Sequence, residues 1–423
     1  MRTIAERPVA AAAPASLAID NLRAVVIILV LSFHSVLAYL QFLPHHPFAF
    51  DGPPLAWRAF PIVDTQRWLG FDLYCAWQDV FLMSFFFMLS GLFAWPSLSR
   101  KGARAFLGDR LLRIGLPFAV VVLLLMPITQ YPTYLQTAAD PSIADYWRKW
   151  LALSIWPSGP MWFLWLLLIG DIAVAGLYQL MQSRREALTR FSHYARAHPV
   201  RFLAGVLLAS VLAYVPPALV FGTQGWAQWG PFAVQFCRPL HYAVYFFAGV
   251  AIGACGIERG LLAADGPLAR HWRRWLIAAP PLFFAWAGLT GLTMGQGAGA
   301  SLGLQAIDDV SYAAACLASC FMVFALALHL GRRRWPVLDS LKANAYGMYL
   351  IHYLFVVWLQ YALLGFGWPA IVKGAIVFAG TLALSWSATA ALRREPWIAY
   401  LIGGERRRPA VRPVAAGSPG LAS

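Results

Sequence analysis

The segment Asp20-Asn-Leu-Arg-Ala-Val-Val-Ile-Ile-Leu-Val-Leu-Ser-Phe-His34 decides the fold class of this chain. It opens an apolar run over 20–43 that is long enough to cross a bilayer as a helix. Arg23 and His34 are eleven positions apart. They therefore lie on nearly the same helical face, separated along the axis by about 16 Å. Ionisable groups at membrane depth usually face a protein interior or a wet cavity, and they often mark function. The segment therefore predicts a functional site inside a membrane bundle.

The composition supports a membrane protein with many spans. Of the 423 residues, 60% are hydrophobic and 12% are charged, whereas an ordinary soluble domain has about 25% charged residues. The net charge of +15 would indicate nucleic acid in a soluble protein. Here the basic residues lie in short loops between apolar segments, and membrane orientation is the simpler cause. We expect contact with membrane lipids and no nucleic-acid partner.

The chain contains about ten apolar segments of suitable length. They cover residues 20–43, 77–96, 111–130, 160–181, 202–221, 237–256, 275–294, 309–330, 345–365 and 369–391. Most of the 33 Lys and Arg residues lie at the two ends of the chain and in alternate connections. This asymmetry predicts an all-α polytopic bundle with both termini in the cytoplasm.

Three regions follow from this division. Residues 1–19 form a cytoplasmic N-terminal segment, 20–392 form the transmembrane domain, and 393–423 form a basic, disordered cytoplasmic tail. The long outer connections 44–76 and 131–159 are rich in Pro, Trp, Tyr and Asp. They are expected either to cover a cavity as interfacial lids or to anchor at headgroup level. The five cysteines have no metal-site or CxxC spacing, so we expect no disulfide framework and no metal.

Four further motifs follow in order, and with Arg23 and His34 they resemble the membrane acyltransferase 3 family. They are Phe85-Phe-Phe-Met-Leu-Ser-Gly91, Phe106-Leu-Gly-Asp-Arg-Leu-Leu-Arg-Ile-Gly-Leu-Pro117, Pro160-Met-Trp-Phe-Leu164 and Asn344-Ala-Tyr-Gly-Met-Tyr-Leu-Ile-His352. The resemblance covers nearly all of residues 17–392. Around Met88 and the loop 97–102, the chain most resembles the glucan succinyltransferase branch.

The resemblance implies that an acyl group, acetyl or succinyl, moves from a cytoplasmic acyl-CoA to a hydroxyl of a glucan or other envelope carbohydrate. It also implies a multi-pass protein of a bacterial-type inner (cytoplasmic) membrane. Acyl-CoA and the carbohydrate acceptor are then the partners, with no tightly bound cofactor. Composition alone also fits a secondary transporter or exporter of a sugar or acyl compound, although the two halves of the chain show no matching interrupted helices.

His34 and Arg23 are the predicted catalytic residues. Burial favours the neutral imidazole that a general base requires, so His34 is expected to take the proton of the acceptor hydroxyl. Arg23 is expected to bind or polarise the donor. Alternatively, His34 hydrogen-bonds a neighbouring helix, and Arg23 extends to the headgroups. The chain has no Gly-x-Ser-x-Gly elbow, so direct transfer without a serine nucleophile is expected.

The donor-binding residues are predicted to be Arg110, Arg113, Ser90 and Gly91. Arg110 and Arg113 are three apart on one helical face and could bind donor phosphates, although basic residues there also satisfy the orientation rule. Gly91 permits close approach of a donor thioester or of another helix.

Asp79, Trp162 and His352 are predicted to support this site. Asp79 could orient His34, Trp162 could stack on a sugar, and His352 could position substrate or orient another polar group. Interface anchoring explains Trp162 equally well, and a structural role explains His352 equally well.

Overall fold

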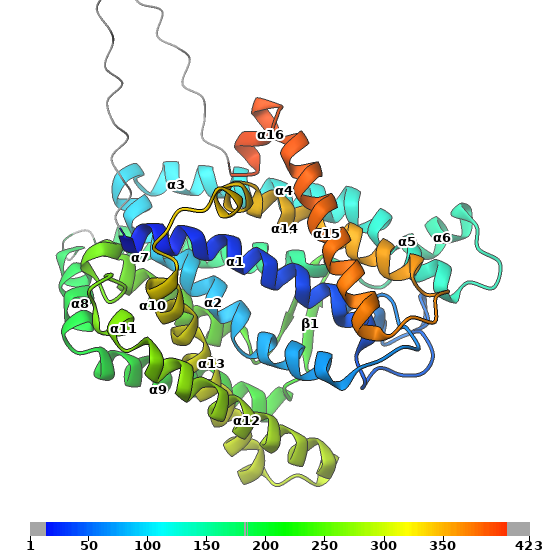
Figure 1. Cartoon of the computed structure of the whole chain (residues 1–423), viewed down its shortest axis with the longest axis horizontal. Helices are drawn as coiled ribbons and strands as arrows, with labels where there is room; N and C mark the ends of the chain where they lie inside the picture. The colour runs from blue at the N-terminus through cyan, green and yellow to red at the C-terminus, as the bar shows by residue number, and fades with distance from the viewer. Residues whose placement is uncertain (1–13, 182, 184, 404–423) are drawn as a thin grey trace, which may run out of the picture.

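The computed structural model describes residues 14–181, 183 and 185–403, and these form a helical bundle with one short hairpin (Figure 1). Each of the ten predicted segments coincides with helical structure. The long helices are α1 (Pro14–Val36), α2 (Leu69–Lys101), α7 (Trp162–Leu180), α9 (Pro199–Phe221), α10 (Pro239–Gly253), α12 (Trp272–Gln296), α13 (Leu302–Leu330), α14 (Pro336–Ala362) and α15 (Ala370–Leu392). Among the described residues, eight helical segments are long and apolar enough to cross a membrane. The prediction of a polytopic helical membrane protein is confirmed.

Two of the ten segments differ from a simple span. α10 has 15 residues, which corresponds to about 22 Å, less than the ~30 Å thickness of a bilayer core. α14 has 27 residues and is long enough, but it is less apolar because it carries side chains such as His352 and Gln360. Polarity in a membrane helix indicates a wet or functional interior.

The predicted ends of the chain lie largely outside the described residues. Residues 1–13 belong to the predicted N-terminal segment and 404–423 to the predicted tail, so the domain division and the cytoplasmic placement of both ends stay predictions. Within the predicted tail, Pro396–Leu401 form a short helix, α16. The guanidinium of Arg113 lies over the ring of Tyr400, 4.4 Å from its centroid, and this contact ties α16 to the bundle.

The third predicted span is a continuous rod with two wide turns. It consists of α3 (Ala103–Arg110), a π turn (Leu111–Gly115), α4 (Leu116–Val120), a second π turn (Val121–Leu125) and α5 (Met126–Thr137). Pro117 and Pro127 each follow one of the wide turns. A proline has no N–H and its ring crowds the carbonyl four residues earlier, so a wide turn at that place relieves the conflict.

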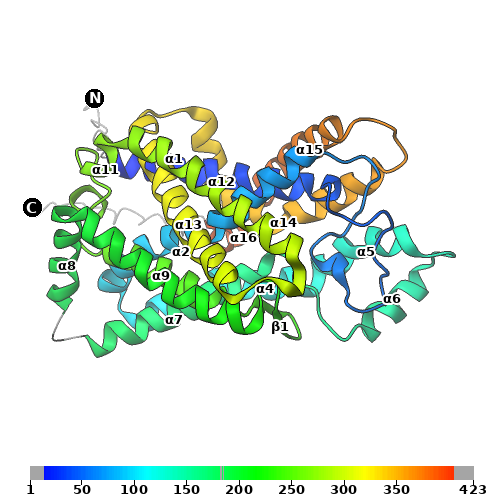
Figure 2. The same cartoon turned by 90° about the horizontal axis from the view of Figure 1, so that it is seen from below.

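α1 lies in the interior of the bundle, where it contacts α2, α13, α14 and α15 (Figure 1). Its apolar residues are distributed all round the helix, and such a helix buries best among several neighbours. By contrast α12 packs mainly on α13 and is exposed over most of its length (Figure 2). Because α1 is central, side chains on it can meet side chains from several helices.

α2 and α10 pack with their backbones in direct contact. A methyl group added at Gly249 would overlap the carbonyl oxygen of Met88, and one at Gly253 would overlap that of Leu92. Gly91 on α2 faces the carbonyl of Phe246 in the same way. Small residues that allow such close approach are the usual means of helix association in membranes. This row of contacts is called the glycine seam below.

Replacement of Gly249 by valine is expected to destabilise the bundle by about 1–3 kcal/mol or more, because the added atoms meet backbone that cannot rotate away. Thermal unfolding of the purified protein in detergent measures the effect. Gly205→Ala in α9 is the matched control, since a Cβ there meets nothing within 4 Å. An unchanged melting temperature for Gly249→Val would contradict the seam.

The connection 44–68, which is predicted to lie on the outer side, folds back onto the end of α1. The backbone N–H of Asp64 donates to the carbonyl of Ala38 at 3.0 Å, and that of Trp68 donates to Tyr39 at 3.0 Å. The Asp64 carboxylate is 1% exposed and pairs with Nζ of Lys373 on α15 at 2.7 Å. This ion pair closes the outer end of the bundle over α1.

The remaining outer elements are short. α6 (Ile143–Ala152) lies in the second predicted lid, and β1 (Trp226–Trp229) pairs antiparallel with β2 (Phe232–Gln235). The pattern of apolar spans did not predict this hairpin, because it lies in a connection between two of them.

Candidate active site

His34 is in the last turn of α1, half-buried, and faces α14. Its Nδ1 lies 2.9 Å from the carbonyl oxygen of Val30 and 3.3 Å from Nε2 of His352. The other nitrogen of His352, Nδ1, lies 2.7 Å from the carbonyl oxygen of Tyr349. The sequence could not place these two histidines together, since they are 318 positions apart.

The hydrogen-bond pattern assigns the tautomers of the two rings. A carbonyl oxygen only accepts, so Nδ1 of His352 carries its proton and Nε2 is left as an acceptor. Nδ1 of His34 then faces two acceptors and carries the proton of that ring. The lone pair of His34 is therefore on Nε2, which makes no hydrogen bond to any described residue. An imidazole held in this way presents its basic nitrogen outward from the pair.

Aromatic side chains surround the two histidines. The ring of Tyr353 meets His34 edge to face at 5.3 Å. Tyr349 donates its hydroxyl to the carbonyl of Pro160 at 2.5 Å, and Tyr353 lies against Gly159. Three stretches far apart in the sequence, α1, the turn just before α7 and α14, therefore meet around the two histidines and their neighbouring tyrosines.

Comparison with known proteins identifies the family of the chain. A family model described as an acyltransferase domain matches residues 16–390. The chain belongs to the membrane acyltransferase 3 family. No curated protein and no solved structure matches it. The family is one of enzymes, so the match favours an acyltransferase over the transporter that composition alone allowed.

Gln360 is a site residue of this acyltransferase that the sequence motifs did not single out. It is 2% exposed, and its Nε2 donates to the carbonyl of His34 at 3.0 Å and to that of Ser35 at 3.2 Å. α1 ends at Val36, so these carbonyls have no intrahelical partner. The one signal in the sequence was a lone amide among apolar residues in the predicted ninth span.

Gln360→Leu is expected to lower kcat about ten- to hundredfold with little change in the KM for the donor, because the end of α1 and with it the His34 ring lose their fixed position. Steady-state kinetics of the purified acyltransferase measure both constants. Gln296→Leu, at an exposed position of α12, is the control. A variant that only melts earlier and keeps its kcat would show that Gln360 is structural alone.

Arg23 is exposed on α1 and forms no hydrogen bond or ion pair with the described residues. It does not contact His34, as expected for two residues about 16 Å apart along one helix. Its guanidinium is therefore not used by the fold, and its role toward the donor stays a prediction.

Arg110 and Arg113 of this acyltransferase have different neighbours. Arg110 Nε lies 3.3 Å from Oδ2 of Asp171, which is buried in α7. Arg113 lies over Tyr400, and its carbonyl accepts from the Tyr346 hydroxyl at 2.5 Å. The first π turn begins at Leu111, between the two arginines, and this changes the spacing on which a shared face was predicted. Their donor-binding role stays a prediction.

Ser90 and Gly91 are adjacent on α2, and Trp162 is the first residue of α7. Ser90 is half-buried and makes no side-chain hydrogen bond to a described residue, whereas Gly91 is part of the glycine seam. Trp162 stacks on Tyr242 of α10 with ring centroids 5.8 Å apart. The structure thus gives Gly91 and Trp162 packing roles, and no site role for them has been tested.

Asp79 forms an ion pair with Arg238 and makes no hydrogen bond or ion pair with His34, so the prediction that it orients His34 is wrong. Its Oδ2 lies 2.7 Å from Nη2 of Arg238, which is 5% exposed and also donates to the hydroxyl of Tyr312. Two groups therefore orient His34, namely His352 and the Val30 carbonyl. No described carboxylate forms a hydrogen bond with the His34 ring.

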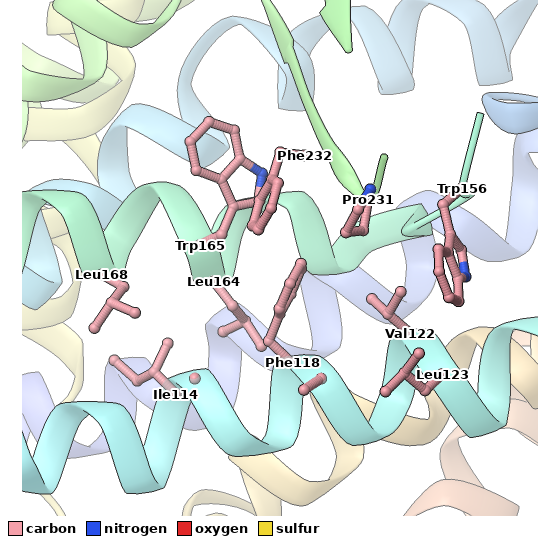
Figure 3. A pocket seen from close by; sticks show the side chains of 12 residues that line it. Ile114, Phe118, Val122, Leu123, Trp156, Leu164, Trp165, Leu168, Pro231 and Phe232 are labelled. Atoms are coloured by element: carbon pink, nitrogen blue, oxygen red, sulfur yellow. The ribbon is translucent and has the colours of Figure 1, made fainter. Parts of the chain in front are cut away.

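An apolar groove runs along the outside of the rod. It has a volume of about 370 Å³ and lies between the rod, α7 and the hairpin, with side chains such as Phe118, Trp165 and Phe232 on its walls (Figure 3). Both π turns contribute to it, through Ile114 and Val122. His34 does not line this groove, which is therefore separate from the site.

Proposed function

We propose that this acyltransferase moves an acetyl or succinyl group from a cytoplasmic acyl-CoA to a hydroxyl of a glucan or another envelope carbohydrate, with His34 as the general base. The observation that carries the proposal is the His34–His352 pair at the end of a buried helix. It leaves Nε2 of His34 with a lone pair and no partner among the described residues. A base must have a free lone pair within reach of the proton that it removes.

In the proposed reaction, His34 is the only protein group that accepts and donates a proton. Nε2 of His34 takes the proton of the acceptor hydroxyl while the hydroxyl oxygen attacks the thioester carbonyl. A C–O bond forms, the C–S bond breaks, and the thiolate of coenzyme A takes the proton from Nε2. The imidazolium that exists between these steps is stabilised by two acceptors at Nδ1, the Val30 carbonyl and His352.

The remaining roles in the proposal follow from position. The guanidinium of Arg23 has no partner among the described residues, and on the predicted donor side of α1 it can meet a phosphate or polarise the thioester carbonyl. Arg110 and Arg113 lie on the rod at the side of the membrane that the charge pattern assigns to the cytoplasm. The glucan acceptor and the location in an inner membrane rest on the resemblance in sequence.

Mass spectrometry of envelope glucans tests the proposal. Glucans are compared from cells with the protein, cells without it, and cells with His34→Ala, after equal amounts in the membrane have been verified. An acyl mass that requires both the protein and His34 supports the proposal and identifies the group. An unmodified glucan in all three strains overturns the acceptor, and an equal acylated product from His34→Ala overturns the base.

A further inference from the structure

A second cavity lies between the two long connections 44–76 and 131–159, on the side of the protein that is predicted to be outer. Its volume is about 450 Å³. One wall is the turn containing Asp51 and Leu55, and the other is the end of α6 with Arg148 and Lys149. In Figures 1 and 2 this region forms one end of the molecule, beyond α5. We call it the outer pocket.

The charged groups that line the outer pocket are balanced once Asp145, which lies beside the lining and pairs with both of its cations, is included. Nζ of Lys149 lies 3.0 Å from Oδ2 of Asp51 and 3.7 Å from Oδ2 of Asp145, and Arg148 pairs with Asp145. The hydrogen bond from Lys149 lowers the pKa of Asp51, and the one from Arg148 lowers the pKa of Asp145. Both carboxylates are therefore ionised at neutral pH. Two anions face two cations, so the pocket has strong donors and acceptors without an excess of either charge.

The pocket is held on a packed aromatic base. The rings of Phe50 and Trp57 stack at 5.0 Å, and Nε1 of Trp57 donates to the carbonyl of Phe50 at 2.9 Å. The hydroxyl of Tyr134 donates to Asp145 at 2.9 Å. These contacts fix both walls before any ligand binds, and such preorganisation lowers the entropy lost on binding.

Part of the lining is apolar. Pro53, Leu55 and Leu153 contribute to it, whereas the Asp51 and Arg148 side chains are 54% and 78% exposed. A ligand in the outer pocket would meet both aliphatic surface and charged hydrogen-bonding groups on each wall. Ligand sites usually combine an apolar surface with a few placed polar groups in this way.

We infer that the outer pocket binds a neutral sugar unit of the acceptor polymer. A sugar hydroxyl both donates and accepts, so it can bridge an Asp51 oxygen and a Lys149 or Arg148 nitrogen at once. The C–H face of the ring then rests on the leucines and the proline. An anionic ligand would instead meet the exposed Asp51 carboxylate without an excess of cations to offset it. The inference rests on the proposed carbohydrate acceptor and assigns it a place.

The test uses purified full-length protein in lipid nanodiscs, with acyl-CoA as donor and a neutral β-glucan oligosaccharide as acceptor. Asp51→Asn and Lys149→Met are expected to raise the KM for the oligosaccharide about tenfold each, since a charge-assisted hydrogen bond is lost in each case. The KM for acyl-CoA stays unchanged. Asp140→Asn is the control, because Asp140 is exposed on the same connection and does not line the pocket.

A binding measurement without donor separates this inference from the proposed function. Saturation-transfer NMR detects the oligosaccharide on the wild-type protein and on Asp51→Asn. If the wild-type protein transfers no acyl group to glucan yet binds the oligosaccharide through Asp51, the proposed function fails and the outer pocket stands. If transfer proceeds with the same acceptor KM in both pocket variants, or if the oligosaccharide does not bind, the inference is overturned. Tighter binding of an acidic uronate oligosaccharide would overturn the neutral class.

Discussion

Acyl transfer is expected to fall about 10²- to 10⁴-fold when His34 is replaced by alanine, which is the usual contribution of a positioned general base. The loss should be in kcat, because the imidazole accepts the proton in the transition state and binds neither substrate strongly in the ground state. Replacement leaves the Nε2 of His352 without the donor that it now faces, but His352 keeps its bond to the Tyr349 carbonyl. The measurement is the single-turnover rate with radiolabelled acyl-CoA.

His329→Ala is the matched control for this variant. His329 is exposed near the end of α13 and stacks on Trp272, away from α14. It should leave the rate unchanged. Added imidazole should restore part of the activity of His34→Ala, since it can enter the vacated space and supply a lone pair in place of Nε2. A His34→Ala protein with the wild-type rate would show that another group removes the proton.

The largest effect on stability is expected at Lys373. Its ammonium is fully buried at the start of α15 and pairs with Asp64, so Lys373→Met leaves a carboxylate buried without its cation. Loss of one partner of a buried ion pair costs about 3–5 kcal/mol. The apparent melting temperature of the detergent-solubilised protein should drop, and the connection 44–68 should become sensitive to protease.

A double-mutant cycle separates the ion pair from packing. Asp64→Asn together with Lys373→Met removes both charges, and the asparagine oxygen can still accept from the N–H of Gln66, which now donates to Asp64 at 2.8 Å. The double variant should recover most of the stability lost by Lys373→Met, since replacing both members of a buried pair is often neutral. Additive losses in the double variant would contradict this account.

The spans were predictable because each depends on a local property. Apolar length places a helix in the membrane, and the distribution of basic residues indicates its direction. The end of α10 at Gly253 was not predictable, because the sequence remains apolar beyond it and the helix ends at a turn through Gly256, whose φ is +87°. The π turns of the rod depend on prolines whose effect on a helix varies with its neighbours.

The sequence allowed prediction of only those site residues whose role could be recognised from their own helix. His34 stood out as an imidazole deep in an apolar run, and that reasoning needed no neighbour. The partner of His34 depends on which helices touch, and Asp79 was a reasonable choice until the structure placed it against Arg238. Gln360 acts on backbone carbonyls, and no pattern of side chains in the sequence points to such a contact.

The glycine seam also limits how this enzyme can move. Gly249 and Gly253 are one turn apart, so a shift of α10 by one turn toward its C-terminal end would bring Tyr245 to the place of Gly249, where only a hydrogen atom fits. α2 and α10 therefore form a rigid pair, and the register of one helix against the other is fixed at the glycine seam. Substrate entry and product release must then come from hinge motion of the elements around that pair, since sliding within it is sterically closed.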